Sequence, residues 1–290
     1  MKQSFTFKQF EVRQERCAMK VGTDGVLLGA WARVEHCRRI LDMGTGTGLV
    51  ALMAAQRSQA HIVAIDLDAD AVAQATENVA ASPWADRIQV LEADARELAN
   101  SQFTIHNSQL NHPEANCPLS VVNCELSTHP EANCPLSVVN CELSTHLEAN
   151  CELSIVNCQL FDALLCNPPF FENSLKCPDS ARTMARHTDT LSFDELARSA
   201  ARLLSPEGEL SVVIPYDRAH DMTVSAACHG LFATRQTVVV PVEGGKPKRI
   251  LMAFTREGAA HAVETLCIQD AQRVYTPAYI HLVEDFYLKM

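Results

Sequence analysis

The stretch DMGTGTG, residues 42–48, decides the fold of this 290-residue chain. It follows a short apolar run, residues 38–43, and opens a segment of helical composition, residues 49–57. A glycine-rich turn between a strand and a helix is where an open α/β sheet binds a nucleotide-like ligand. The stretch therefore predicts a strand, a ligand-binding turn and a helix.

Strand and helix patterns alternate on both sides of this loop. The predicted strands are residues 38–43, 61–68, 87–94, 161–170, 209–215, 234–242 and 249–255. The predicted helices are residues 49–57, 68–82, 192–204 and 276–290, with Ser192 as a cap and Pro277 at the first position of the last helix. Residues 205–208 (SPEG) read as a turn. The pattern predicts an α/β fold with a mostly parallel, seven-stranded sheet covered by helices on both faces.

The composition limits the class of protein. The chain carries 35 acidic and 24 basic side chains, a net charge of −11, and 47% hydrophobic residues, which excludes a disordered or collagen-like chain. No apolar stretch reaches the roughly 18 to 20 residues of a membrane helix, and the first residues do not resemble a signal peptide. We therefore expect a cytoplasmic protein without a membrane partner, whose 12 cysteines are reduced thiols.

A 17-residue repeat interrupts the pattern, with copies that start at His112, His129 and His146. We interpret residues 1–290 as a single domain in which residues 100–160 form an insert, either a surface loop or a small β-rich outgrowth. Each full copy also contains a His and two Cys, so a zinc site is the functional alternative to these two structural interpretations of the repeat. Because the C-x2-C pairs of structural zinc modules are missing, we expect no metal.

The glycine spacing distinguishes between ligands. A dinucleotide site needs G-x-G-x-x-G, but here Gly44, Gly46 and Gly48 are closer together, and Leu49 occupies the position of the third glycine. Three small residues allow a ligand to lie against bare backbone. Asp42 is anionic and would suit an amine-bearing ligand.

Two further acids follow the next two strands. Asp66 comes 20 residues after Gly46 and could accept both hydroxyls of a ribose, and Asp94 could accept from the exocyclic amine of an adenine. An amino-acid end, a ribose and an adenine without phosphate describe S-adenosylmethionine. Taken singly, each acid could instead cap a helix or a turn.

The sequence NPPF ends the strand predicted at residues 161–170. Its two prolines, Pro168 and Pro169, remove backbone donors and leave carbonyl acceptors at the ligand-binding edge of the sheet. The Asn167 side-chain oxygen and the Pro168 carbonyl could accept both N–H bonds of a conjugated amine and turn its lone pair toward the methyl group of the cofactor. Asn167 thus belongs to both the catalytic and the cofactor-binding set, and Phe170 would stack on a planar substrate.

These motifs resemble the class I S-adenosylmethionine-dependent methyltransferases that act on amino groups. The chain is most similar to the bacterial family that methylates the exocyclic N6 amine of adenine 37 beside the anticodon of a valine tRNA. The resemblance rests on residues 5–32, 77–90 and 275–290, and covers residues 5–98 and 161–290. It implies a Rossmann-like fold, a tRNA partner and a role for Lys20, Gly22 and Thr23 in closing over the cofactor.

Basic clusters reconcile an acidic chain with an RNA partner. Five basic residues lie within residues 1–20, and two further clusters flank the proposed pocket. The members of these clusters are Lys2, Lys8, Arg13, Arg16 and Lys20, then Arg182, Arg186 and His187, and then Lys246, Lys248 and Arg249. The sequence leaves the oligomeric state open.

Three other functions compete with tRNA methylation. Glutamine methylation in a release factor also uses an NPPY-like corner, but such enzymes usually have a separate N-terminal helical domain. Base methylation of ribosomal RNA is a second alternative. The third is a non-catalytic RNA-binding protein that has retained the fold. This interpretation would require a damaged glycine loop or a damaged NPPF corner, but both motifs are intact in the sequence.

Overall fold

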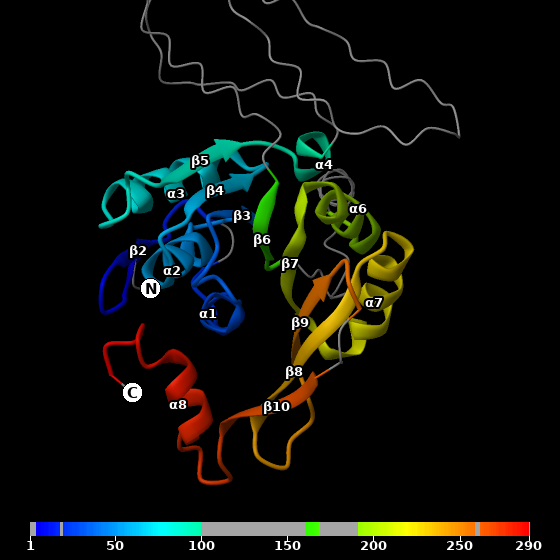
Figure 1. Cartoon of the computed structure of the whole chain (residues 1–290). Coiled ribbons are helices and arrows are strands. Elements are labelled where there is room, and N and C mark those ends of the chain that lie inside the picture. Colours follow the sequence, from blue (N-terminus) through cyan, green and yellow to red (C-terminus); the bar gives the residue numbers. More distant parts are fainter. Residues whose placement is uncertain (1–3, 18–19, 100–159, 169–190, 259–261, 290) are drawn as a thin grey trace, which may run out of the picture. The chain divides into compact units, whose positions relative to one another are not determined.

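The computed structural model describes residues 4–17, 20–99, 160–168, 191–258 and 262–289 (Figure 1). These residues belong to one compact unit, which comprises Met1–Ile105 and Cys158–Met290. The predicted insert lies outside the described residues apart from Leu160, so neither the loop nor the β-outgrowth interpretation is tested. Pro169, Phe170 and the basic cluster at residues 182–187 also lie outside them.

One eight-stranded sheet organises the unit, in the order β10-β8-β9-β7-β6-β3-β4-β5. Only β9 runs antiparallel to its neighbours, so the predicted mostly parallel sheet is confirmed. The strands are β3 (Arg39–Met43), β4 (His61–Asp66), β5 (Ile88–Glu92), β6 (Phe161–Cys166), β7 (Leu204–Pro215), β8 (Phe232–Val242), β9 (Arg249–Thr255) and β10 (Ala262–Gln269).

The predicted count of seven strands was wrong, because β10 adds an eighth at the edge of the sheet. Among the residues of β10, only Leu266 is buried, and the first four are exposed. A strand with one buried side chain lacks the apolar alternation by which strands are recognised. A separate antiparallel pair, β1 (Ser4–Thr6) and β2 (Glu11–Arg13), was also not predicted, since each strand has only three residues.

The helices of the described residues are α1 (Thr23–Trp31), α2 (Leu49–Arg57), α3 (Ala69–Ala80), α4 (Ala95–Leu98), α6 (Phe193–Leu203), α7 (Ala219–Cys228), α8 (Pro277–Val283) and the 3-10 turn η1 (Tyr216–Arg218). The predicted helices α2, α3 and α6 are confirmed. Ser192 caps α6 through a capping box with Glu195. The helices α1, α4 and α7 were not predicted.

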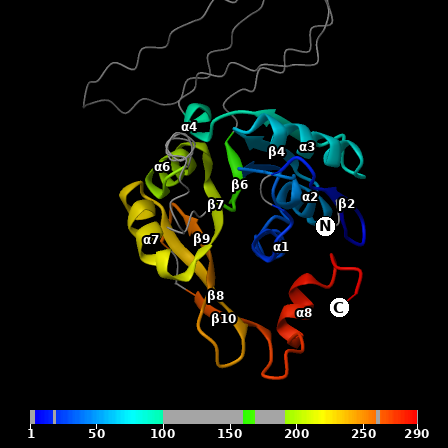
Figure 2. The same ribbon diagram turned by 180° about the vertical axis from the view of Figure 1, so that it is seen from behind.

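Helices cover both faces of the sheet, as predicted (Figures 1 and 2), and the buried apolar residues form two cores. One core joins the sheet to α1, α2 and α8, and it includes Leu27, Leu52 and Val283. The other joins the sheet to α4, α6 and α7, and it includes Leu98, Leu196 and Met222. Helices on both faces leave the carboxyl ends of the parallel strands as the ligand-binding edge.

Several segment boundaries differ from the prediction, and the strand predicted at residues 161–170 ends at Cys166. The last helix ends at Val283 instead of continuing to residue 290, because Phe286 and Tyr287 pack against the N-terminal residues. Tyr287 forms a bridge with Phe7, and their rings stack with centroids 5.8 Å apart. Residues 205–208, predicted as a turn, belong to β7, where the pairing with β6 shifts register between Phe161 and Ala163.

Candidate active site

The register of the sheet brings the predicted site residues to one edge. Met43, at the end of β3, pairs with Ile65 of β4 and with Cys166 of β6. Asp66, the last residue of β4, pairs with Glu92, the last residue of β5. The glycine loop, Asp66, Asp94 and Asn167 therefore leave the sheet at neighbouring positions, as the sequence predicted.

The glycine loop has a conformation that only glycine adopts easily. Gly44, Gly46 and Gly48 all have positive φ, of 72°, 55° and 82°. A Cβ atom on Gly44 or Gly46 would have no atom within 4 Å, so open space rather than close packing lies beside the bare backbone. The backbone N–H groups of Gly44 and Thr45 both donate to the Ile65 carbonyl at 2.9 Å. These two hydrogen bonds fix the glycine loop to the end of β4, and the open space beside Gly44 and Gly46 leaves room for a ligand.

Asp42 stabilises the glycine loop through two buried hydrogen bonds. Its carboxylate is 2% exposed and accepts hydrogen bonds from the Thr45 hydroxyl at 2.6 Å and from the Ala51 N–H at 3.1 Å. Burial raises the pKa of Asp42 to about 7, although both hydrogen bonds act to lower it. These contacts make Asp42 a positioning residue for the loop and the start of α2. The predicted contact with an amine of the ligand stays a prediction.

Asp66 links the loop to the turn that precedes α3. One of its oxygens accepts from the Gly46 N–H at 2.8 Å, and the other accepts from the Asp68 N–H at 3.0 Å. The cap of α3 is Asp68 rather than Asp66, because the Asp68 side chain accepts from the Asp70 N–H. Each carboxylate oxygen of Asp66 retains a second acceptor position, as a pair of ribose hydroxyls would require.

Asp94 is held by a partner that the sequence reasoning missed. It caps the short helix α4 by accepting from the Arg96 N–H at 2.8 Å, and the Arg96 side chain contacts both carboxylate oxygens. Arg96 also reaches Glu195 at the start of α6, at 3.3 Å. The hydrogen bonds with Asp94 raise the pKa of Arg96, which is therefore a permanent cation beside this acid. The i,i+2 spacing within DAR was the available signal.

Asn167 is half-buried directly after β6, and the N-terminal helix α1 approaches it. A Cβ atom on Gly25 would lie 3.9 Å from Asn167 Nδ2, at ordinary contact distance, and 3.1 Å from Leu49 Cδ2, which would have to shift by a few tenths of an ångström. Gly22 is the N-cap of α1 and Thr23 is its first residue; both are exposed, as is Lys20. Of the first turn of α1, Gly25 is the residue that the structure places beside Asn167, and the predicted roles of Lys20, Gly22 and Thr23 stay predictions. Pro168 is buried beside Asn167.

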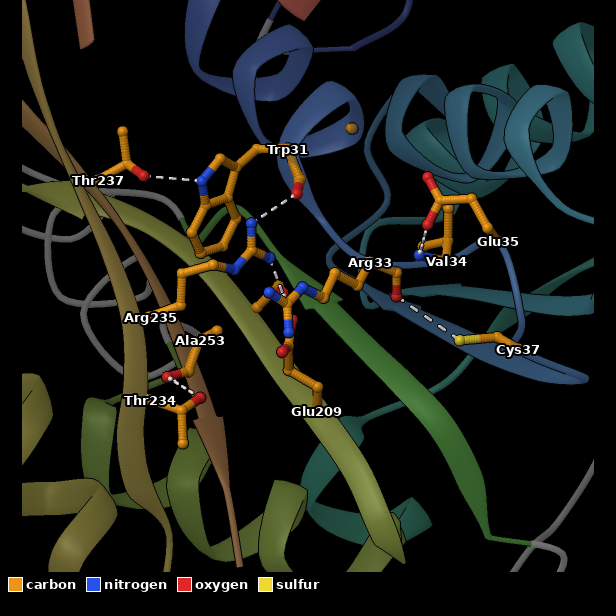
Figure 3. A network of polar contacts seen from close by, with 12 residues as sticks. Trp31, Arg33, Val34, Glu35, Cys37, Glu209, Thr234, Arg235, Thr237 and Ala253 are labelled. Carbon is orange, nitrogen blue, oxygen red and sulfur yellow. Dashed lines mark hydrogen bonds and ion pairs between the residues drawn. The ribbon is translucent and has the colours of Figure 1, made fainter. Parts of the chain in front are cut away.

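The far end of α1 is anchored to β8 by a polar network (Figure 3). The Trp31 Nε1–H donates to the Thr237 hydroxyl at 2.8 Å, and both side chains are buried. The Arg235 guanidinium lies over the indole, 3.5 Å from the ring centroid, and donates to the Trp31 carbonyl at 3.1 Å. Arg235 also pairs with Glu209 at 3.4 Å. These contacts fix the direction of α1, and hence the place of its first turn beside Asn167.

A groove of about 330 Å³ borders the N-terminal half of α1. Its apolar lining includes Leu27, Val239 and Ile268, while Lys248 and Arg249 supply positive charge. Arg249 pairs with Asp24 at 2.8 Å and lies opposite Pro215, the last residue of β7, so Arg249 is at the carboxyl end of that strand. The residues that line it are Thr23, Asp24, Leu27, Val239, Pro241, Lys248, Arg249 and Ile268.

The described residues contain no group of three or more His, Cys, Asp and Glu side chains placed to hold a metal ion. None of the helices in the described ranges has the length and apolar character needed to cross a bilayer. The cysteines in the same ranges are Cys17, Cys37, Cys166, Cys228 and Cys267, and all are free thiols.

Comparison with known proteins agrees with this site. A family model described as a methyltransferase domain matches residues 40–120, which include the glycine loop, Asp66 and Asp94. A tRNA1(Val) (adenine(37)-N6)-methyltransferase of Phocaeicola vulgatus is 43% identical over 286 residues, which cover 99% of this chain and 98% of the relative. The chain belongs to the tRNA1(Val) (adenine(37)-N6)-methyltransferase family. A Bacteroides fragilis protein of the same name is 40% identical with the same coverage.

A solved structure supports the fold independently. The crystal structure of a predicted O-methyltransferase from Agrobacterium tumefaciens matches with a TM-score of 0.55 at 18% identity, and covers 91% of this chain and 96% of the other. This likeness confirms the class I methyltransferase architecture inferred from the resemblance. The match to the Phocaeicola vulgatus relative covers 99% of this chain, so it includes the N-terminal region as well as the sheet.

Proposed function

We propose that this chain transfers the methyl group of S-adenosylmethionine to the exocyclic N6 amine of adenine 37 in the anticodon loop of a valine tRNA. The observation that carries the proposal is the register of β3, β4 and β6, because it brings the glycine loop, Asp66 and Asn167 to one edge in a chain 43% identical to a full-length relative of that name.

The residues of the edge fit the cofactor. The open space beside Gly44 and Gly46 accommodates the amino-acid end against bare backbone, and Asp66 has acceptor positions for two ribose hydroxyls. Asp94 would accept from the adenine amine, for which Arg96 must yield part of its contact with the carboxylate. When bound, the cofactor supplies an electrophilic methyl group on a sulfonium.

Asn167 and Pro168 would act on the substrate amine. The lone pair of adenine N6 is delocalised into the ring, which makes the nitrogen a weak nucleophile. Acceptance of its two N–H bonds by the Asn167 side-chain oxygen and the Pro168 carbonyl would orient the nitrogen and stabilise the positive charge that develops on it. Because the amine becomes acidic only once it is alkylated, no strong base is required before the transfer, and the methylated nitrogen then releases its extra proton to water. Pro169 and Phe170 complete the proposed corner, with Phe170 stacked on the flipped adenine.

RNA would approach over the groove beside α1. Lys248 is exposed there, and Lys246 lies in the adjoining turn, while Arg249 is partly neutralised by Asp24. In the N-terminal cluster, Arg16 is likewise paired with Glu77 at 2.9 Å. We expect Lys246 and Lys248 to contribute phosphate contacts that position the anticodon loop without reading its sequence.

The test combines product analysis with cofactor binding. The purified chain is incubated with methyl-labelled S-adenosylmethionine and unmodified total tRNA, and the nucleosides are identified by mass spectrometry. We expect labelled N6-methyladenosine in valine tRNA. Its absence, with cofactor binding intact, would refute the substrate, and ribosomal RNA and release factors would then be tested with the same label.

Three variants separate the proposed roles. Asn167→Ala should abolish transfer and leave the Kd for S-adenosylmethionine within about twofold, whereas Asp66→Ala should raise that Kd at least about tenfold, which corresponds to about 1.4 kcal/mol. Asp68→Ala is the matched control, because it removes a nearby carboxylate that caps α3 and does not touch the glycine loop. An equal loss of binding in the Asn167 and Asp66 variants would contradict this division of roles.

A further inference from the structure

Asn78, on α3, joins the glycine loop to an N-terminal segment that lies beside α3. We call residues 11–17 the N-terminal arm; it contains β2, which contacts α3 (Figure 1). The Asn78 side-chain oxygen accepts from the Arg13 N–H at 2.9 Å. Its amino group donates to the Arg13 carbonyl and to the Thr47 carbonyl, both at 2.8 Å. Thr47 lies between Gly46 and Gly48, so one amide group holds the arm and the loop together.

The Asn78 amide has no spare donor and is almost inaccessible. A primary amide has two N–H donors, and both are used here, while the residue is 1% exposed. A movement of the Thr47 carbonyl would therefore break a buried hydrogen bond unless Asn78, and with it Arg13, moved as well. Buried polar groups without partners are costly, so the two segments are expected to shift together or not at all.

A further hydrogen bond links the N-terminal arm to the residues just before α1. Gln14, also buried, accepts from the Val21 N–H at 2.8 Å, and Val21 directly precedes Gly22, the N-cap of α1. Hydrogen bonds of Asn78 with Arg13, and of Gln14 with Val21, thus link α3 through the arm to the residue that precedes the N-cap of α1.

Gln74 provides a natural comparison on the same face of α3, four residues before Asn78. It is also 1% exposed, and its side-chain oxygen accepts from the Glu15 and Arg16 N–H groups at 3.0 and 3.2 Å. Its hydrogen bonds hold the arm, but none of them reaches the glycine loop, whereas Asn78 binds both.

We propose that Asn78 is a positioning residue that couples cofactor binding in the glycine loop to the ordering of the N-terminal arm. The inference rests on the proposed cofactor site. A ligand that fixes the loop fixes the Thr47 carbonyl, and through Asn78 it lowers the free energy of the state in which the arm is closed. By thermodynamic reciprocity, a closed arm strengthens cofactor binding by the same factor.

The experiment measures amide hydrogen exchange of the arm with and without saturating S-adenosylmethionine, together with the Kd of the cofactor by calorimetry. In the wild-type chain, the cofactor should slow exchange at residues 11–16 at least about tenfold. Asn78→Asp keeps the acceptor for Arg13 but replaces the donor atom with an oxygen that faces two carbonyls. This variant should reduce the slowing to below about twofold and raise the Kd about tenfold, or about 1.4 kcal/mol.

Gln74→Met is the matched control, because it removes two arm contacts and leaves the Asn78 contacts in place. It should speed exchange of the arm in the free protein, retain the slowing by the cofactor, and leave the Kd within about twofold. If both variants lose the coupling to the same extent at equal thermal stability, Asn78 has only a structural role and the proposal is overturned.

The wild-type measurement alone also tests the proposal, should Asn78→Asp fail to fold. Unchanged exchange at residues 11–16 on saturation with the cofactor would overturn it. A wild-type chain that does not bind S-adenosylmethionine would overturn the proposed cofactor site and the coupling together. Cofactor binding with intact coupling, but no methylation of tRNA, would refute only the proposed substrate.

Discussion

The buried carboxyl group of Asp42 makes the stability of this protein depend on pH in a predictable direction. Burial raises the pKa of Asp42 in the folded chain from 3.8 to about 7. A raised pKa of an acid means that the folded state favours the protonated form. Its stabilising contribution is complete below the unfolded pKa and is lost as the pH rises through the folded pKa.

The size of the effect follows from these two pKa values. Between pH 5 and pH 7, the carboxyl is ionised in the unfolded chain and protonated in the folded one, so the free energy of unfolding falls by about 1.36 kcal/mol per pH unit. Because the slope falls off as the pH approaches the folded pKa, the loss between pH 5 and pH 8 is roughly 2 to 3 kcal/mol, and little more is lost at higher pH. Because Asp42 is 2% exposed, solvent screening does not reduce this figure appreciably.

The variant Asp42→Asn isolates this contribution. The Asn side-chain oxygen can still accept from the Thr45 hydroxyl and the Ala51 N–H, but the residue no longer titrates. Urea unfolding of both proteins at pH 5 and pH 8 gives the difference in free energy of unfolding, in which the titration of all other groups cancels. Relative to wild type, the variant should gain roughly 2 to 3 kcal/mol of stability between pH 5 and pH 8. A difference that is the same at both pH values would refute the reasoning.

Three further predictions test the contacts of α1 and the contribution of residues 100–160. In Gly29→Ala, the new Cβ would lie 2.7 Å from Met53 Sδ and 2.8 Å from Met53 Cβ, so we expect a loss of about 1 to 3 kcal/mol in the free energy of urea unfolding; unchanged stability would contradict the tight contact of α1 with α2. Trp31→Phe removes the donor to Thr237, and a double-mutant cycle with Thr237→Val should give a coupling of about 1 kcal/mol, whereas additive losses would exclude it. Replacing the 61 residues 100–160 by a linker of about ten residues should leave cofactor binding intact and, by loop-closure entropy, stabilise the fold by about 1.5 kcal/mol; loss of cofactor binding in a folded variant would show that the insert supports the site.

The sheet and the ligand edge could be predicted because their signals are local. The apolar runs of β3, β4 and β6 and the glycine loop can each be recognised in a short stretch of consecutive residues. Parallel pairing then brings their ends together. The exposed strand β10 and the short hairpin of β1 and β2 lack such runs. Their formation depends on partners distant in the sequence, and so does the pairing of Phe7 with Tyr287, which ends the last helix early.

The identities of the site residues were easier to predict than their partners. Asp42 was expected to face the ligand, but nothing in its neighbourhood in the sequence indicated that its carboxylate would be buried under Thr45 and Ala51. Asn78 gave no signal of its role either, because its three hydrogen bonds join residues 65 and 31 positions away. Contacts across such separations follow from the packing of α3 against the arm, which no local pattern encodes.

The topology explains why a long connection between β5 and β6 need not displace Asn167. The strand β5 lies at one edge of the sheet, whereas β6 lies between β3 and β7, so the chain must cross from the edge to the centre between these two strands. Four consecutive residue pairs, from Ile40 with Ala163 to Met43 with Cys166, fix the register of β6 against β3. The pairs of β6 with β7 fix its other side. Asn167 is therefore placed by the ladders on both sides of β6 and by the approach of Gly25, and the length of the preceding connection enters only through its entropy, which grows slowly with length.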